Sequence, residues 1–347
     1  MIAATEPVQR PADAKLLVID GRRDMRHVSR VELVELLRAG DLVIANDAAT
    51  LPASLSGRHV PSGGVVEVRL AGRRSLSPHD VESFTAIVFG AGDFHTPTEH
   101  RPLPPPLSAG DSLLLGPLHA AITRLLDHPR LVSLRFDGLP DDIWSGIARH
   151  GHPLQYAHIA NPLALWDVWT PIAGSPVAFE PPSAGFVLDW RTLTALRAHR
   201  IAFATLTLAA GISSTGDLEL DARLPFDEPF HVPETTADAV NRAKREGRRV
   251  VAIGTTVVRA LEHAVDRSGR VRAGDGLATR RIGASTPLRV VDAILSGVHE
   301  PATSHYQLLR AFADDETLHR ADALMNALGY RTHEFGDSMF VEAGSQS

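Results

Sequence analysis

The segment that decides the fold reads Val250-Val251-Ala252-Ile253-Gly254-Thr255-Thr256-Val257-Val258-Arg259-Ala260-Leu261-Glu262. An apolar, β-branched run stops at Gly254, and helical spacing follows, so we predict a buried strand, a tight turn and a helix start. Such a turn presents backbone N–H groups at a helix N-terminus, where a carboxylate, a phosphate or a ribose oxygen can bind. The alternative interpretation is that Thr255 or Thr256 only caps the helix and that Arg259 pairs with Glu262.

Strand and helix patterns alternate on either side of this segment. Apolar strand patterns occupy residues 16–19, 42–45, 202–208, 249–253 and 338–341. Helical patterns occupy residues 29–38, 234–246, 305–312 and 316–328. The first of these helices opens on Ser29-x-x-Glu32, which is typical of a capping box, and the second ends at Gly247. The turn after Ile253 therefore lies at the carboxyl end of a strand, the usual ligand side of an α/β sheet.

The pattern of apolar and polar residues changes between residues 61 and 153. Short alternating segments separated by Gly, Pro and Asp turns occupy residues 65–70, 84–89, 112–115, 119–123 and 131–136. This spacing is typical of a small antiparallel β-barrel. We predict a mixed α/β fold in which residues 1–60 and 154–347 form one discontinuous α/β domain and residues 61–153 form an inserted β-barrel domain.

Composition limits the classes of function. The 347 residues are 44% hydrophobic and include no cysteine, which excludes disulfides, thiolate zinc sites and a cysteine nucleophile. The net charge of −6 argues against a large nucleic-acid surface, although arginines gather at residues 242–249, where a solvated helix face is the simpler explanation. No apolar run is long enough to span a membrane. We expect a cytoplasmic monomer without membrane contact.

Several motifs resemble one enzyme family. The stretch at residues 254–262, GTTVVRALE, is similar to GTTSVRALE of the S-adenosylmethionine:tRNA ribosyltransferase-isomerase family, the enzymes of queuosine synthesis. Further resemblances follow in the family's order at residues 40–47 (GDLVIAND), 51–53 (LPA), 182–185 (PSAG), 291–294 (VDAI), 298–301 (VHEP) and 335–339 (FGDSM). The likeness runs from about residue 16 to about residue 341, which is nearly the whole chain.

The chain also departs from the family pattern. Ala48-Ala49 stand where the family has an arginine, Val187 stands where it has a histidine, and Ala302 replaces its lysine. Side chains of these three types bind anions or move protons. The resemblance therefore implies the fold more directly than it implies the substrate.

The reaction that the resemblance implies moves and isomerises the ribosyl portion of S-adenosylmethionine onto the aminomethyl group of a 7-deazaguanine in tRNA. Adenine and methionine are released, S-adenosylmethionine is a cosubstrate, tRNA is the candidate partner, and no cofactor or metal is expected. Candidate binding residues are Asn46, Asp47, Ser183, Gly185, Gly254, Thr255, Thr256 and Arg259. Among them, Arg259 could hold the methionine carboxylate bidentately, and Asn46 with Asp47 could bind ribose or adenine.

Two residues are candidates for catalysis. His299 lies in a matched motif and histidine titrates near neutral pH, whereas Asp337 could accept hydrogen bonds or balance the sulfonium. A structural histidine and an ordinary Gly-Asp turn are the competing interpretations. Two other functions stay open: a divergent S-adenosylmethionine-using enzyme with a non-tRNA acceptor, and a non-catalytic S-adenosylmethionine-binding relative.

Overall fold

A nine-stranded mixed sheet forms the larger part of the computed structural model, which describes residues 1–301 and 303–344. Its strands, from one edge to the other, are β16 (Gly274–Ala278), β14 (Glu228–Val232), β13 (Ala202–Leu208), β4 (Leu42–Asn46), β15 (Val250–Ile253), β17 (Ala293–Gly297), β19 (Ser338–Glu342), β2 (Lys15–Ile19) and β3 (Met25–Ser29). The central strands β13, β4, β15 and β17 are parallel. Their carboxyl ends therefore meet at one edge of the sheet.

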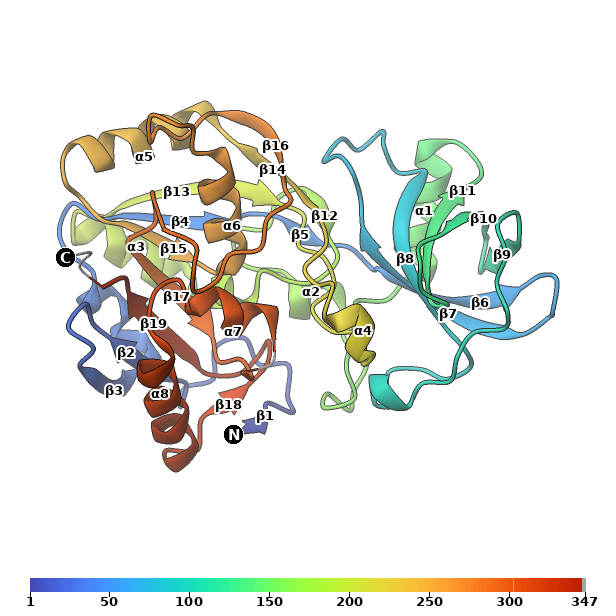
Figure 1. The fold of residues 1–347 in the computed structure, drawn as a ribbon, viewed down its shortest axis with the longest axis horizontal. Helices are drawn as coiled ribbons and strands as arrows, with labels where there is room; N and C mark the ends of the chain where they lie inside the picture. Colours follow the sequence, from blue (N-terminus) through green and yellow to red (C-terminus); the bar gives the residue numbers. More distant parts are fainter. Residues whose placement is uncertain (302, 345–347) are drawn as a thin grey trace.

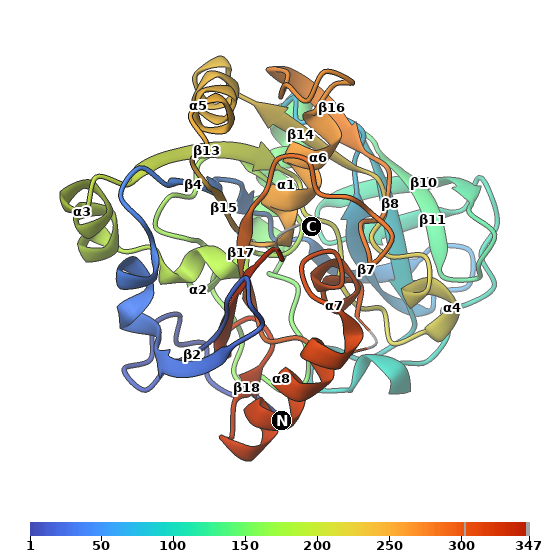
Figure 2. The same ribbon diagram turned by 60° about the vertical axis from the view of Figure 1, so that its left-hand side comes forward.

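Both faces of this sheet are covered, as Figures 1 and 2 show. One face packs against helices α5 (Glu234–Arg245), α6 (Thr255–Ala264), α7 (Ser304–Leu309) and α8 (Asp315–Ala327). The other face packs against η1 (Arg30–Leu36), η3 (Ser183–Val187) and α3 (Trp190–Ala198). Successive residues of β15 point to opposite faces, so Val250 and Ala252 join the first core, whereas Val251 and Ile253 join the second. Burial on both faces explains the continuous apolar run in the sequence.

A closed antiparallel barrel lies to one side of the sheet (Figure 1). Its strands follow the order β10 (Leu118–Leu125), β11 (Leu131–Phe136), β8 (Ser83–Phe89), β7 (Val65–Gly72), β6 (Ser54–His59) and β9 (Ser112–Leu115). The helix α1 (Pro140–His150) packs on this barrel through Ile143 and Ile147. The predicted fold class is thus confirmed. The barrel includes β6, however, and so begins before the expected boundary at residue 61; the division into domains stays a prediction.

Short elements complete the described chain. They are β1 (Ile2–Ala3), β5 (Ala49–Thr50), β12 (Pro176–Ala178), β18 (Arg331–Thr332), η2 (Thr98–His100), α2 (Leu165–Val168) and α4 (Leu218–Asp221). The segment after Ser29 forms a 3-10 helix, in which the Glu32 side chain accepts a hydrogen bond from the Ser29 N–H, as the capping-box motif predicts. Within residues 1–301 and 303–344, no helix is long and apolar enough to cross a membrane.

A buried charge network lies on the outer face of the barrel strand β7, because Val66, Val68 and Leu70 take the alternate positions that face the barrel core. Glu67 is 4% exposed, and its carboxylate accepts hydrogen bonds from Arg69 Nε at 2.8 Å, from Ser54 Oγ at 2.7 Å and from Arg101. Burial raises the pKa of Glu67, but the two guanidinium groups outweigh it and hold the pKa below its ordinary value. The Arg69 guanidinium lies over the rings of Phe89 and Tyr156, at 4.9 and 5.7 Å from their centroids, and Tyr156 belongs to the segment that follows the barrel.

Glu67→Gln should therefore destabilise the protein by about 3–5 kcal/mol, because it leaves two buried guanidinium groups without their counter-charge. Urea unfolding followed by circular dichroism measures this free energy. Glu82→Gln is the matched control, since the ion pair between Glu82 and Arg135 is exposed and should contribute less than about 1 kcal/mol. Equal effects of the two substitutions would contradict the assignment of Glu67 as the counter-charge.

Candidate active site

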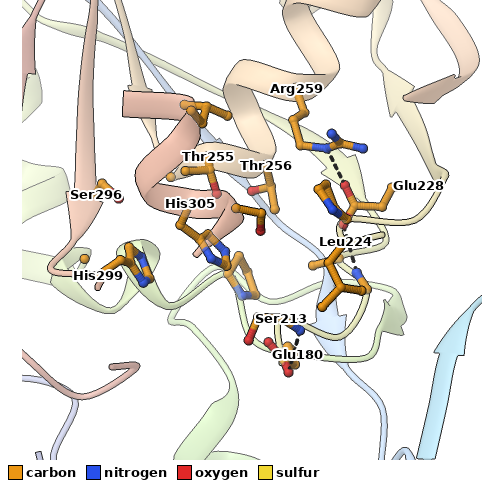
Figure 3. A pocket seen from close by; sticks show the side chains of 18 of the residues that line it. Glu180, Ser213, Leu224, Glu228, Thr255, Thr256, Arg259, Ser296, His299 and His305 are labelled. Atoms are coloured by element: carbon orange, nitrogen blue, oxygen red, sulfur yellow. Dashed lines mark hydrogen bonds and ion pairs between the residues drawn. The ribbon is translucent and has the colours of Figure 1, made fainter. Parts of the chain in front are cut away.

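A cavity of about 290 Å³ opens at the carboxyl ends of β15 and β17 (Figure 3). This volume is near the lower end of the range of small-molecule pockets, about 300–1,000 Å³. Its polar lining includes Glu180, Ser183, Ser213, Glu228, Thr255, Thr256, Arg259, Arg281, Ser296, His299, His305 and Gln307. Apolar lining comes from Ala184, Ala210, Ile212, Leu224, Pro225, Ile282 and Leu308. The cavity combines an apolar surface with convergent polar groups, as expected of a binding site.

The N-terminus of α6 faces this cavity. Gly254 has a φ of 95°, a left-handed conformation that favours glycine, and a Cβ here would lie 3.4 Å from that of Ala184. Thr255 and Thr256 follow in the first turn, where backbone N–H groups have no partner within the helix. Within residues 1–301 and 303–344, the buried Oγ1 of Thr256 has no hydrogen-bond partner. Thr256 is therefore a polar group that a ligand can satisfy.

Arg259 lines the cavity, but protein acceptors surround its guanidinium. Nε donates to Glu228 Oε2 at 2.6 Å, Nη1 donates to the carbonyl of Arg280 at 3.0 Å, and Nη2 donates to the carbonyls of Ala278 and Phe226 at 2.8 and 3.3 Å. The expected bidentate grip on a ligand carboxylate does not fit this arrangement, because these bonds occupy most of the N–H directions. Sequence motifs predicted that Arg259 lies at the binding site, but they did not indicate its ion-pair partner Glu228.

Two histidines lie together in the cavity wall. The rings of His299 and His305 stack with centroids 4.3 Å apart, and Figure 3 shows them on neighbouring segments. Burial lowers the pKa of His305 to about 4, and it lowers that of His299 well below the ordinary value, helped by the nearby His305 and His333. Both imidazoles are therefore neutral at physiological pH. The expected place of His299 at the site agrees with this geometry, while its catalytic role stays a prediction.

Glu180 is a candidate that the sequence analysis missed. It is 8% exposed, and its carboxylate accepts hydrogen bonds from the Tyr156 hydroxyl and from the Ser213 N–H, the latter at 3.0 Å. Burial first, and the nearby Glu334 second, raise the pKa of Glu180 to about 7. A carboxyl group that titrates near neutral pH in a cavity is suited to proton transfer. Its position three residues before Ser183 was the only available sequence signal.

Asn46 and Asp47 do not line the cavity. The Asn46 side chain is buried and binds the backbone of Leu208 through both its amide nitrogen and its oxygen, at 2.9 and 3.0 Å. Asp47 Oδ1 accepts a hydrogen bond from the Thr207 hydroxyl at 2.6 Å. In this structure the two side chains join the ends of β4 and β13, where backbone groups beyond the strand pairing need partners. The expectation that they bind ribose or adenine stays a prediction.

Asp337 lies apart from the cavity. It is 1% exposed, lies outside the cavity lining, and accepts hydrogen bonds from the backbone N–H groups of Lys15 and Arg331 at 2.8 and 2.7 Å. Both carboxylate oxygens thus bind the backbone in this structure, and the catalytic role expected of Asp337 stays a prediction. Of the η3 pair, Ser183 lines the cavity, whereas Gly185 packs against Thr170 behind it, where a Cβ would lie 3.1 Å from Thr170 Cγ2.

Positions that depart from the family pattern are mostly internal. Ala48 and Val187 are 1% and 8% exposed and belong to the two cores of the sheet. Neither lines the cavity. The third such position, Ala302, lies outside the described residues.

One cluster in the described chain has the donor atoms of a metal site, although the sequence analysis expected none. The ligand atoms of His158, His333 and Glu334 all lie within 4.8 Å of one another. Residues 158 and 333 are far apart in sequence, so their spacing carried no signal. Glu180 and Glu334 line a small cavity next to the main one, together with His158.

Comparisons with known proteins agree with this architecture. The family model described as "Queuosine biosynthesis protein" matches residues 1–341, so the chain belongs to this family. A protein from Thermus thermophilus named S-adenosylmethionine:tRNA ribosyltransferase-isomerase is 32% identical over 343 residues, covering 97% of this chain and 95% of the relative. A protein of the same name from Syntrophotalea carbinolica is 30% identical over 346 residues, covering 98% and 96%.

A solved structure supports the fold. The crystal structure of S-adenosylmethionine tRNA ribosyltransferase from Thermotoga maritima matches with a TM-score of 0.51 and 22% identity, covering 98% of this chain and 96% of that one. The family model and the full-length relatives confirm the family that the sequence motifs indicated.

Arg259→Ala should destabilise the protein by about 3–5 kcal/mol, since it leaves the carboxylate of Glu228 buried without its counter-charge. Chemical unfolding measures this loss. Arg281→Ala serves as a control from the same cavity: its side chain is exposed, so stability should change by about 0.5 kcal/mol or less. Unchanged stability of Arg259→Ala, combined with lost S-adenosylmethionine affinity, would restore the direct role in ligand binding.

Proposed function

We propose that this protein transfers and isomerises the ribosyl moiety of S-adenosylmethionine onto a 7-aminomethyl-7-deazaguanine in tRNA. Family membership and the names of full-length relatives support this activity. The main structural support for this activity is the cavity at the α6 N-terminus. There Thr256 Oγ1 and the N–H groups of the first turn can bind a polar ligand. Because the acceptor is tRNA, we place the activity in the cytoplasm.

The α6 N-terminus is suited to the carboxylate of the methionyl group. Free N–H groups and the helix dipole both favour an anion at this end of a helix. The hydroxyls of Thr255 and Thr256 add donors beside these N–H groups, as Figure 3 shows. The apolar residues Leu224 and Ile282 line the same cavity and provide surface for the adenine ring.

We assign proton transfer to Glu180 and to the stacked His299 and His305. The sulfonium activates the ribose, so the reaction needs a group that accepts a proton and returns one rather than a strong electrophile. Ionised Glu180 lies in the buried wall of the cavity and can accept a proton. Neutral His299 and His305 can accept a hydrogen bond or a proton from the aminomethyl group or the leaving adenine.

A groove between the barrel and the sheet offers an approach for tRNA. It has a volume of about 1,260 Å³ and shares Pro225 and Arg281 with the cavity. Its basic lining consists of Arg73, Arg74, His79, Arg124, Arg223 and Arg281, and its acidic lining consists of Asp80, Glu82 and Asp227. This local excess of arginine permits phosphate contacts on a chain whose net charge is negative.

Incubation with S-adenosylmethionine and precursor tRNA tests the proposed activity directly. We expect adenine release that depends on tRNA carrying the 7-aminomethyl-7-deazaguanine. Release with a free nucleobase but not with tRNA would favour a different acceptor. Binding of S-adenosylmethionine without any release would favour a non-catalytic relative.

Glu180→Gln should lower adenine release by roughly 10²–10⁴-fold while leaving S-adenosylmethionine affinity within a fewfold of wild type. Since a base must be deprotonated, kcat/KM for S-adenosylmethionine should rise with pH through about 7 in the wild type, the pKa of Glu180, and this rise should disappear in the variant. Steady-state kinetics between about pH 5.5 and pH 8.5, a range that brackets the raised pKa of Glu180, measure both effects. Glu316→Gln, an exposed carboxylate on α8, is the control. An unchanged pH profile would remove Glu180 from the reaction.

Arg124→Ala should raise KM for tRNA and reduce the salt slope of tRNA binding by about one, without changing S-adenosylmethionine affinity. Arg124 is exposed on β10 and lines the groove. Filter binding at several salt concentrations measures the slope. Arg58→Ala removes an exposed barrel arginine outside the groove and should leave the slope unchanged. The same slope for both variants would place the tRNA elsewhere.

A further inference from the structure

A small cavity lies next to the active-site cavity and shares Glu180 and Pro181 with it. Its volume is about 10 Å³, which is room for about one water molecule or one small ion. His158, Glu180 and Glu334 all line it, so a histidine and two carboxyl groups face one confined space. Such a concentration of acidic groups in a half-buried place calls for a compensating positive charge.

His158, His333 and Glu334 converge beside this cavity, which His158 and Glu334 line directly. The two imidazole rings stack with centroids 4.4 Å apart and planes 17° from parallel, and His158 Nε2 lies 3.4 Å from Glu334 Oε2. Ligand atoms about 2.1 Å from a tetrahedral ion are about 3.4 Å apart, so this separation already equals one edge of a zinc tetrahedron. All three donors lie within 4.8 Å of one another, so small side-chain rotations suffice to close the set.

The contact between His158 and Glu334 leaves the Nε2 atom of His158 without a well-aligned hydrogen bond among the described residues. His158 Nε2 is buried, and in the described parts of the chain it has no hydrogen bond of normal geometry, even to the nearby Glu334. His333 has a φ of 69°, a left-handed conformation that costs free energy for a residue with a Cβ. A bound cation would use the Nε2 atom of His158 and balance the carboxylate of Glu334.

We propose that His158, His333 and Glu334 bind a divalent first-row transition-metal ion of the Zn²⁺ class. Two imidazoles and one carboxylate form an established zinc donor set, and imidazole ligands disfavour Mg²⁺ and Ca²⁺. Three protein ligands leave a fourth position for water. This metal site is additional to the proposed ribosyl transfer, whose proposed steps use no metal ion.

Equilibrium dialysis of tag-free, chelator-treated protein against micromolar ZnSO₄ tests the site, with metal content measured by mass spectrometry. We expect about one tightly bound zinc per wild-type chain. Because loss of groups that only support metal ligands costs about 10–100-fold in affinity, loss of a ligand in His333→Ala or Glu334→Gln should cost at least as much. Co²⁺ in place of Zn²⁺ should give the visible absorption of a tetrahedral site in the wild type alone.

Two controls keep the result decisive. His231→Ala breaks a pair between His231 and Asp275, 2.8 Å apart, which belongs to no described three-ligand group, so zinc stoichiometry should not change. Glu334→Gln preserves the shape of the side chain, and circular dichroism verifies that both site variants are folded. Absence of bound zinc in the wild type, or unchanged affinity in both folded site variants, would overturn the proposal.

Discussion

The buried ion pair between Arg259 and Glu228 holds together the walls of the candidate active site. Arg259 extends from the second turn of α6 and also binds carbonyl groups beside β14 and β16. The other oxygen of Glu228 accepts the N–H of Gly211, in the loop that forms the opposite wall. One pair thus fixes the edge strands, the cavity loop and the helix whose N-terminus faces the ligand.

Barrel and cavity are joined by a second set of contacts. Arg69, whose charge is balanced by Glu67 on the outer face of the barrel, lies over the ring of Tyr156, and the Tyr156 hydroxyl donates a hydrogen bond to Glu180. The carboxyl group proposed to move protons is therefore held by a residue that packs on the barrel. This arrangement gives the barrel a part in shaping the cavity, in addition to lining the groove proposed for tRNA.

The strands and the turn at Gly254 could be predicted from sequence because their signals are local. A continuous apolar run indicates a strand that is buried on both faces of the sheet, and a glycine before two threonines indicates a helix start. The roles of the site residues were harder to predict. Asn46 is the last residue of β4 and Asp337 directly precedes β19, and at strand ends a ligand-binding group and a backbone-binding group have the same sequence pattern.

The missed residues act through partners that are distant in sequence. Glu180 acquires its raised pKa from burial and from Glu334, and Arg259 is engaged by Glu228. The cluster of His158, His333 and Glu334 brings together residues that are far apart in the sequence. No spacing rule detects such contacts, because only the folded chain brings the side chains together.

The central claim is that the polar groups at the α6 N-terminus are completed by S-adenosylmethionine. Calorimetric titration of S-adenosylmethionine into wild type and Thr256→Val tests it most directly, because valine keeps the shape of threonine and removes only the unpaired hydroxyl. We predict an affinity about tenfold lower, with unchanged or higher stability of the ligand-free protein, since an unsatisfied buried group is lost. Equal affinities for the two proteins would contradict the account.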